Sequence, residues 1–298
     1  MRGVASAIAE NGGKTGGFTA YITSDVPGGS GLSSSAAYEN MIGTILNSYY
    51  NNNKFSQVDI ARMSQRAENR HFGKPCGLMD QIACAVGGLV FIDFADPAAP
   101  VVKRTDLHLD GYRLCIIRTG GSHADLNEDY ASVPAEMKAV AAYFGKSVLR
   151  EVSEDELITA VPALRKKLGD RAILRALHFM SENKRVEKAL AAAKAGDTDA
   201  FLAEINASGT SSAIALQNYF TCKAPAEQGI TLAVTLAREI MGGKGAARVH
   251  GGGFAGTAQA FVPEEIFDKF VAAMEGAFGK GAVVALEIRN ESATRISD

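Results

Sequence analysis

The stretch Val26-Pro27-Gly28-Gly29-Ser30-Gly31-Leu32-Ser33-Ser34-Ser35 places three glycines and four serines directly before residues 36–50, whose composition suits a helix. Glycine lets backbone N–H groups approach a phosphate closely, and a helix directly behind the loop adds its N-terminal donors and dipole. The serine hydroxyls can cap the helix or reach a phosphate or Mg²⁺. The loop lacks the lysine of a Walker A sequence and the spacing of a Rossmann fingerprint. It therefore predicts either a phosphate-binding loop or an ordinary helix entry.

The composition is that of a globular protein without a basic excess. Of 298 residues, 47% are hydrophobic and 21% are charged, and the formal net charge is −2, so we expect no nucleic-acid partner. Asp80, Asp93 and Asp96 interrupt the most hydrophobic stretch, and residues 1–5 lack a signal-peptide layout, so no membrane segment is expected. The four cysteines show no metal-binding spacing, which favours reduced thiols and a cytoplasmic protein.

The hydrophobic pattern predicts an α+β chain of two lobes, divided into residues 1–112 and 113–298. Alternating or short apolar runs indicate strands, and longer runs with helical periodicity indicate helices. The predicted strands are 18–24, 89–93, 112–118, 246–249, 257–262 and 282–288, and the main predicted helices are 36–50, 57–70, 78–86, 171–195 and 264–278.

Two acidic residues, Glu68 and Asp80, flank a connection rich in glycine and proline at residues 73–77. Such a break can fold the end of one helix and the start of the next toward one cleft, and the dipole of the second helix favours an ionised Asp80. Mg²⁺-dependent phosphoryl transfer requires a carboxylate for the metal and a group that orients or deprotonates the attacking hydroxyl. A solvated surface position remains the alternative for both acids.

Two further motifs invite other interpretations. Residues 250–254, His-Gly-Gly-Gly-Phe, are typical of the oxyanion segment of lipase-like hydrolases, but the chain has no Gly-x-Ser-x-Gly elbow and the segment lies too close to the C-terminus. We therefore reject a hydrolase. His123 and Asp125 look like an acid–base pair, yet a strand-to-helix turn explains them more simply. Tyr130, which follows, is by itself a half-buried structural residue.

Three segments together resemble the GHMP kinases, and the galactokinase family among them. Residues 26–37 resemble the second GHMP signature, Pro-x-Gly-x-Gly-Leu-Ser-Ser-Ser-Ala, and residues 75–81 resemble the galactokinase segment Pro-Cys-Gly-Ile-Met-Asp-Gln. Residues 245–256 resemble the third signature, with His250 in place of a Thr and Ala255 in place of a Gly. The resemblance implies a two-lobed GHMP kinase fold. Its N-terminal lobe would be like domain 2 of ribosomal protein S5, here incomplete, and its C-terminal lobe an α/β sandwich.

The resemblance also implies a role for each part of the site. Ser35 and Glu68 would hold Mg²⁺, and Asp80 would be the catalytic residue that accepts the proton of the substrate hydroxyl. The residues expected to contact ATP are Gly29, Ser30, Gly31, Leu32, Ser33, Ser34 and Ser35. The residues expected to contact the sugar are Gly77, Asp80 and Tyr130, and the turn Gly251, Gly252 and Gly253 would support the active site.

The implied function is an ATP-dependent sugar kinase of galactose metabolism. It would transfer the γ-phosphate of ATP to the anomeric hydroxyl of α-D-galactose and give galactose 1-phosphate. Two alternatives remain. A non-catalytic galactose- and ATP-binding sensor would have a shortened Ser-Ser-Ser-Ala-Ala region, whereas residues 33–37 are complete. A GHMP kinase could also act on another small molecule, such as a galactosamine-type sugar, mevalonate or homoserine.

The family's first signature, Gly-Arg-Val-Asn-Leu-Ile-Gly-Glu-His-Thr-Asp-Tyr, has no counterpart in the sequence. Residues 1–4 already match the helix that follows it. Loss of its arginine and sugar contacts would remove charge stabilisation in the transition state. We therefore expect weak or no galactokinase activity from this polypeptide alone, and association with the missing segment or with itself.

Overall fold

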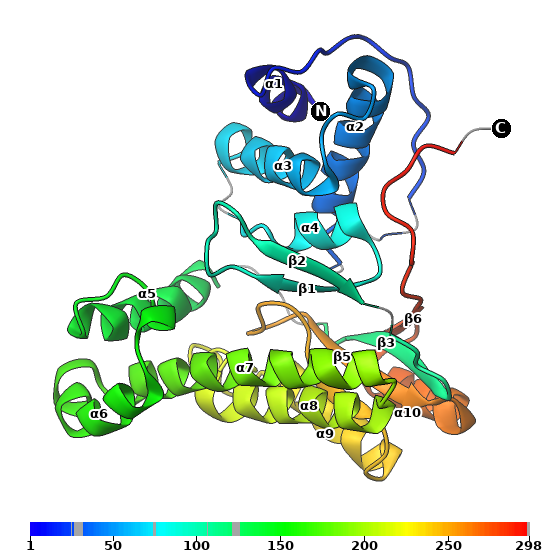
Figure 1. Cartoon of the computed structure of the whole chain (residues 1–298). Coiled ribbons are helices and arrows are strands. Elements are labelled where there is room, and N and C mark those ends of the chain that lie inside the picture. The colour runs from blue at the N-terminus through cyan, green and yellow to red at the C-terminus, as the bar shows by residue number, and fades with distance from the viewer. Residues whose placement is uncertain (25, 27–31, 74–75, 106, 121–125, 297–298) are drawn as a thin grey trace. The chain divides into compact units, whose positions relative to one another are not determined.

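The computed structural model describes all residues except 25, 27–31, 74–75, 106, 121–125 and 297–298 (Figure 1). It divides the chain into two compact units. Unit 1 comprises Met1–Asp106 and Ile288–Asp298, and unit 2 comprises Leu107–Glu287. The predicted lobes, 1–112 and 113–298, stay a prediction, and they differ from these units mainly because the C-terminal segment is grouped with unit 1.

The described residues of unit 1 form four helices and one antiparallel strand pair. Its elements are α1 (Arg2–Glu10), α2 (Ser34–Asn51), α3 (Gln57–His71), α4 (Met79–Val86), β1 (Leu89–Asp93) and β2 (Val101–Thr105). The apolar faces of α1, α2 and α3 form one core, which includes Val4, Ile42 and Ile60. Helix α3 begins with a capping box, in which Ser56 and Asp59 satisfy each other's backbone N–H groups. The helices predicted at 36–50, 57–70 and 78–86 are thus confirmed within two residues.

The strand predicted at residues 18–24 is wrong, because these residues form no strand. Their alternating pattern suits a half-buried strand, but a strand requires a hydrogen-bonded neighbour. Among the described residues of unit 1, β1 pairs with β2 and no third strand joins them. Phe18 instead packs against the core of α1, α2 and α3, whereas the Tyr21 side chain is 95% exposed.

The C-terminal segment of unit 1 is fixed by backbone contacts with the end of α4. The Gly88 N–H donates to Arg289 O at 2.7 Å, and the Ala293 N–H donates to Ala85 O at 3.3 Å. At Gly87, φ is +70° and an added Cβ would lie 2.3 Å from Glu291 O. Only glycine fits so close to the segment with that backbone conformation.

In the described residues of unit 2, four strands form an antiparallel sheet in the order β4-β5-β3-β6. The strands are β3 (Tyr112–Arg118), β4 (Ala246–Val249), β5 (Thr257–Pro263) and β6 (Val283–Leu286). The helices are α5 (Asn127–Tyr143), α6 (Glu154–Leu168), α7 (Asp170–Ala195), α8 (Thr198–Ser211), α9 (Gly229–Met241) and α10 (Phe267–Phe278), with short turns η1 (Leu149–Glu151), η2 (Ser212–Leu216) and η3 (Glu264–Ile266). The strand predicted at 112–118 matches β3, whereas the last predicted strand, 282–288, shortens to β6.

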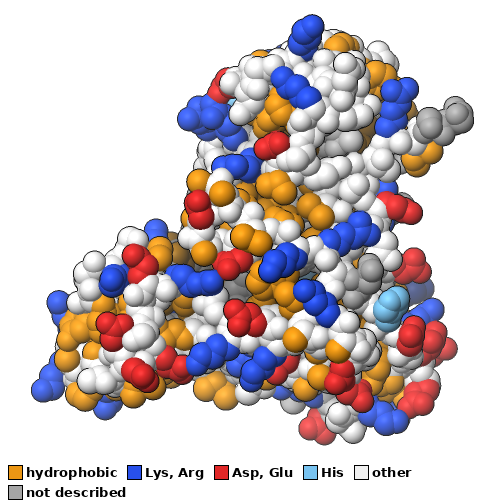
Figure 2. All heavy atoms as spheres, viewed as in Figure 1, with side chains coloured by type: hydrophobic (Ala, Val, Ile, Leu, Met, Phe, Trp, Pro, Cys, Tyr) orange, Lys and Arg blue, Asp and Glu red, His pale blue; other side chains and the backbone are white. Residues whose placement is uncertain are grey.

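Buried apolar side chains hold the described part of unit 2 together. Buried side chains of β3, β4 and β5 pack with α9 and α10, where Phe270 is fully buried. A second core joins α5, α6 and α7 through residues such as Leu157, Leu164 and Ala176. Acidic and basic side chains are mixed over the visible face of these helices (Figure 2). The predicted α+β class is therefore confirmed. In the described part of the chain, no helix is both long enough and apolar enough to cross a bilayer.

Candidate active site

Helix α2 begins directly behind the glycine- and serine-rich loop. Ser34 is its first residue, and Ser33 precedes it with φ 54° and ψ 47°, in the left-handed region that non-glycine residues seldom adopt. Such conformations cluster at functional sites, where the surroundings hold them in place. Leu32 and Ser34 are half-buried and Ser35 is exposed. Of the residues predicted to contact ATP, Gly29, Ser30 and Gly31 lie outside the described residues.

Asp80 occupies the first turn of α4, as the sequence predicts, and is exposed to solvent. The Ser33 hydroxyl donates a hydrogen bond of 2.5 Å to Asp80 Oδ2. The serine at the start of α2 therefore holds one carboxylate oxygen of the predicted catalytic residue. Gly77, predicted to contact the sugar, lies just before α4 and is exposed.

Glu68 lies in the last turn of α3, and its residue is only 5% exposed. The Ser35 hydroxyl donates to Glu68 Oε1 at 3.2 Å, which joins the two residues predicted to hold Mg²⁺. The structure thus brings Ser33, Ser35, Glu68 and Asp80 together at the start of α2. We call these four residues the carboxylate cluster, and their roles stay predictions.

Gln81 is a residue of this site to which the sequence assigned no role. Its side chain is 1% exposed, and its Nε2 donates to Glu68 Oε2 at 3.2 Å. Its backbone carbonyl accepts from Asn40 Nδ2 of α2 at 3.0 Å, and Ser64 of α3 donates to Asn40 Oδ1 at 3.4 Å. Gln81 therefore ties α4 to both neighbouring helices and orients Glu68. The signal that could have indicated Gln81 is its position as an amide in a short, largely apolar helix, directly after the predicted catalytic Asp80.

Cys76 adds a thiol next to Glu68. Burial, followed by a hydrogen bond to Glu68, raises the pKa of the Cys76 thiol to about 11. Helix α3 holds its backbone, because Asn69 Oδ1 accepts from Cys76 N at 2.8 Å and Gln65 Nε2 donates to Cys76 O at 3.1 Å. At neutral pH the thiol is therefore protonated and acts as a neutral donor to Glu68.

The donor chemistry of the carboxylate cluster fits Mg²⁺. This ion prefers oxygen ligands and usually takes one or two carboxylates, with water and phosphate oxygens in its other positions. Glu68 and Ser35 supply such oxygens, and the buried Gln81 Oε1 has no hydrogen-bond partner within the described part of the chain, so it can accept from a water molecule. No group of three or more His, Cys, Asp or Glu side chains in the described residues is arranged to hold a metal.

A cavity of about 790 Å³ lies in unit 1 between α2, α4 and the C-terminal segment. It touches Val26, at the beginning of the loop, and Ala37, in the first turn of α2. Met41 and Ile45 line it along α2, which makes this wall apolar. An apolar cavity next to polar groups is the usual form of a small-molecule site.

In unit 2, the predicted supporting turn follows β4 and contacts Tyr130. The Tyr130 hydroxyl donates to Gly253 O at 2.9 Å, and its ring lies edge-on to Phe254 with centroids 5.5 Å apart. An added Cβ at Gly252 would lie 2.7 Å from the Tyr130 ring. Burial and the neighbouring Asp129 raise the pKa of Tyr130. Gly251 is exposed at the start of the turn.

His250, which replaces the threonine of the family signature, is also accounted for. Its Nδ1 lies 3.1 Å from Gln259 Oε1 on β5. His250 therefore contributes a polar contact to β5 directly before the turn. The order of glycines at 251–253 is unaffected.

Comparison with known proteins first defines the class. Residues 1–88 match the family model described as "GHMP kinases N terminal domain". The fold is similar to the crystal structure of Lactococcus lactis galactokinase complexed with galactose, with a TM-score of 0.76 and 22% identity over 97% of this chain and 74% of that chain. It is also similar to L. major mevalonate kinase in complex with R-mevalonate, with a TM-score of 0.54 and 14% identity, over 85% of this chain and 64% of that chain. The fold is therefore that of the GHMP kinases.

Closer relatives define the family. The chain is 33% identical over 288 residues to a galactokinase of Streptomyces coelicolor, which covers 95% of this chain and 70% of the relative. It is 36% identical over 244 residues to a galactokinase of Glaesserella parasuis, which covers 82% of this chain and 61% of the relative. The chain belongs to the galactokinase family. It spans between about three fifths and seven tenths of the length of these relatives.

Proposed function

We propose that the chain transfers the γ-phosphate of ATP to the anomeric hydroxyl of α-D-galactose, giving galactose 1-phosphate, in galactose metabolism. The observation that carries this proposal is the carboxylate cluster at the start of α2, directly behind the predicted phosphate loop. Membership of the galactokinase family supports galactose as the acceptor. We place the reaction in the cytoplasm, as the sequence predicts.

Asp80 is the proton acceptor in this proposal. It is exposed, and the Ser33 hydrogen bond fixes Oδ2, so that among the described residues Oδ1 is left to receive the proton of the sugar hydroxyl. A positioned base of this kind contributes roughly 10²–10⁴-fold to a rate. Most of the remaining catalysis of phosphoryl transfer comes from positioning and charge stabilisation.

Glu68 and Ser35 would hold Mg²⁺ in this proposal. When bound, the ion offsets the negative charge of the ATP phosphates. The protein's own contribution is the fixed orientation of Glu68, to which Ser35 and Gln81 donate hydrogen bonds. Outer groups that orient a metal ligand in this way often matter nearly as much as the ligand itself.

ATP is the phosphoryl donor. Residues 29–35 would contact its phosphates, because the first N–H groups of α2 have no partner within the helix and lie at the positive end of its dipole. The apolar cavity beside Val26 and Ala37 would receive the base. On the sugar side, Gly77 and Tyr130 would contact galactose, and Gly251–Gly253 would support Tyr130 through the Gly253 carbonyl.

A phosphorylation screen tests the proposal. Purified chain is incubated with MgATP and, separately, galactose, galactosamine, N-acetylgalactosamine, mevalonate or homoserine, and each product is identified by mass. Product identity after long incubation is the readout, because the chain spans only part of the length of its relatives. Galactose 1-phosphate supports the proposal. A phosphorylated product from another acceptor, or galactose and ATP binding without turnover, overturns it and favours another GHMP kinase or a sensor. Sedimentation of the same sample tests the predicted self-association.

A further inference from the structure

Arg175 of α7 is the largest fully buried side chain in the described part of the chain. Its residue is 1% exposed, and burial lowers its pKa from the ordinary value. A buried guanidinium is costly unless it is hydrogen-bonded and paired with a carboxylate. The contacts of Arg175 therefore indicate which segments of the chain this buried side chain holds in place.

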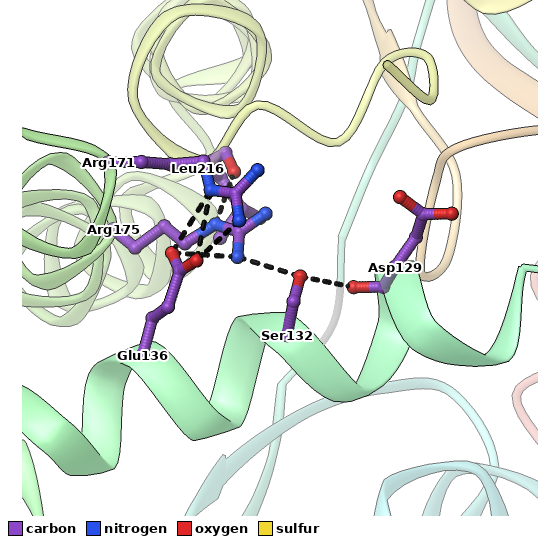
Figure 3. A network of polar contacts seen from close by, with 6 residues as sticks. All are labelled: Asp129, Ser132, Glu136, Arg171, Arg175 and Leu216. Atoms are coloured by element: carbon purple, nitrogen blue, oxygen red, sulfur yellow. Dashed lines mark hydrogen bonds and ion pairs between the residues drawn. The ribbon is translucent and has the colours of Figure 1, made fainter. Parts of the chain in front are cut away.

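Those contacts connect α7 to two other elements (Figure 3). Nη1 donates to Ser132 Oγ and to Glu136 Oε2, both on α5 and both at 2.9 Å. Nε donates to the carbonyl of Leu216, the last residue of η2, at 3.1 Å. Arg171, one turn earlier on α7, also donates to Glu136 at 2.6 Å. Arg175 therefore fixes α5 and the end of η2 to the same helix.

The α5 contact leads to one side of the glycine turn at residues 251–254. Tyr130 precedes Ser132 by two residues on α5, and its hydroxyl donates to Gly253 O. Ser132 itself donates to the carbonyl of Asp129 at 2.7 Å, so the first turn of α5 is joined to Arg175 through one serine. The position of Tyr130 thus depends on a segment that Arg175 holds.

The η2 contact leads to the other side of the same turn. Asn218 follows Leu216 by two residues, and its carbonyl accepts from Phe254 N at 2.5 Å. Its Nδ2 donates to Gly252 O at 3.1 Å. At Gly253, φ is +82° and an added Cβ would lie 2.1 Å from Asn218 O, so the two segments are in direct contact.

The geometry of η2 explains why the carbonyl of Leu216, at its C-terminal end, requires a hydrogen-bond donor. It is a π-helical turn, a rare form often found at functional sites, and Gln217 then turns into the left-handed region with φ 59°. Carbonyls at a helix end lack partners within the helix. The guanidinium of Arg175 donates to the Leu216 carbonyl and so fixes the position of the backbone that leads to Asn218.

We propose that Arg175 is a positioning residue for the glycine turn and for Tyr130. It holds α5 and the end of η2 at a fixed spacing, so that Tyr130 and Asn218 contact residues 252–254 from two sides. The consequence for sugar binding rests on the proposed function, because that function makes Tyr130 a sugar contact. The fixing of the turn does not depend on it.

Amide hydrogen exchange of Arg175→Lys tests the proposal. Lysine keeps the charge but cannot bond α5 and Leu216 with one planar group. We expect exchange of the Phe254 amide, which bonds Asn218 O, to become at least about tenfold faster, with the β3–β5 ladder unchanged. Unchanged exchange at Phe254, or equal acceleration throughout unit 2, overturns the proposal. Arg165→Lys, at an exposed ion pair with Asp170, is the matched control. It should change neither the exchange of the Phe254 amide nor that of the β3–β5 ladder.

A milder variant and a kinetic readout complete the test. Ser132→Ala removes one bond of Arg175, so it gives a smaller acceleration at Phe254 and decides the question if Arg175→Lys does not fold. In the kinase assay, Arg175→Lys raises KM for galactose more than it lowers kcat, and the effect is non-additive with Tyr130→Phe. Additive effects contradict positioning through Tyr130. If the wild-type chain does not phosphorylate galactose, the proposed function fails while the exchange experiment still decides the role of Arg175.

Discussion

Charged groups have opposite roles in the carboxylate cluster of unit 1 and in the Arg175 network of unit 2. This network consists of Ser132, Glu136, Arg171 and Arg175. Asp80 is exposed and accepts a hydrogen bond from the neutral hydroxyl of Ser33. In unit 2, Glu136 contacts the guanidinium groups of both Arg171 and Arg175. An accessible carboxylate held by a neutral donor can accept a proton from a substrate, whereas a buried ion pair fixes backbone segments. We infer that unit 1 supplies the reacting groups and that the network in unit 2 fixes the turn beside Tyr130.

The network in unit 2 is expected to contribute strongly to stability. Arg175→Met removes one of the two guanidinium partners of Glu136 and leaves the Leu216 carbonyl without its donor, and such an unsatisfied buried acceptor typically costs about 1–3 kcal/mol in the free energy of unfolding. Urea unfolding followed by circular dichroism measures the change. Arg165→Met is the matched control, because its ion pair with Asp170 is exposed and little change is expected. Equal effects of the two substitutions would remove the distinction between buried and exposed pairs.

The protonated state of Cys76 gives a second test, on the side of unit 1. Its pKa of about 11 lies about two units above the ordinary 9.0, so its thiolate fraction at pH 8 is roughly a hundredfold below that of an ordinary thiol. Alkylation by iodoacetamide, followed by peptide mass mapping, should therefore accelerate about tenfold per pH unit from pH 8 to pH 10.

Glu68→Gln sharpens this test by removing the carboxylate that contributes to the raised pKa of Cys76. The alkylation profile of Cys76 should then move to lower pH. Cys84 is the internal control, because burial and Asp80 raise its pKa to about 11. A parallel shift of both cysteines would show a general loosening of unit 1 and not a contact with Glu68.

Gln81 tests whether the orientation of Glu68 matters for the metal. Gln81→Met keeps the approximate volume but removes the hydrogen bond to Glu68 Oε2. Loss of an outer group of this kind typically weakens metal binding by about 10–100-fold. Titration of Mn²⁺ in the presence of ATP, followed by electron paramagnetic resonance, measures it. Gln228→Met, whose amide donates to Pro225 O in unit 2, should have no effect. Wild-type affinity in Gln81→Met would mean that Glu68 is oriented without it.

The sequence predicted those parts of the fold that depend on local pattern. Helices α2, α3 and α7 follow clear periodicity and punctuation, and they lie within two residues of the predicted ranges. The absence of a strand at residues 18–24 could not be predicted in this way, because strand formation depends on a neighbour from elsewhere in the chain. The grouping of residues 288–298 with unit 1 likewise depends on contacts across about 200 residues, such as Gly88 with Arg289.

The candidate site shows the same division. Ser33, Ser35, Glu68 and Asp80 lie in motifs whose residue types indicate phosphate and metal chemistry, and the structure brings them together. Arg175 lies in the predicted helix 171–195, and nothing near it in the sequence indicates that its partner is a carbonyl 41 positions later. Buried polar residues are the part of a site that sequence pattern identifies least well, since their partners are distant in the chain.

The most direct test of the proposed chemistry compares Asp80→Asn with Asp268→Asn, which changes an exposed acid in the first turn of α10. Phosphorus NMR follows galactose 1-phosphate formation from MgATP, and urea unfolding of the same samples measures stability. We expect Asp80→Asn to form product about 10²–10⁴-fold more slowly than wild type, with unfolding free energy unchanged within about 0.5 kcal/mol, and Asp268→Asn to match wild type. Product formation by Asp80→Asn at the wild-type rate, or a loss of stability that accounts for its lower rate, would contradict Asp80 as the proton acceptor.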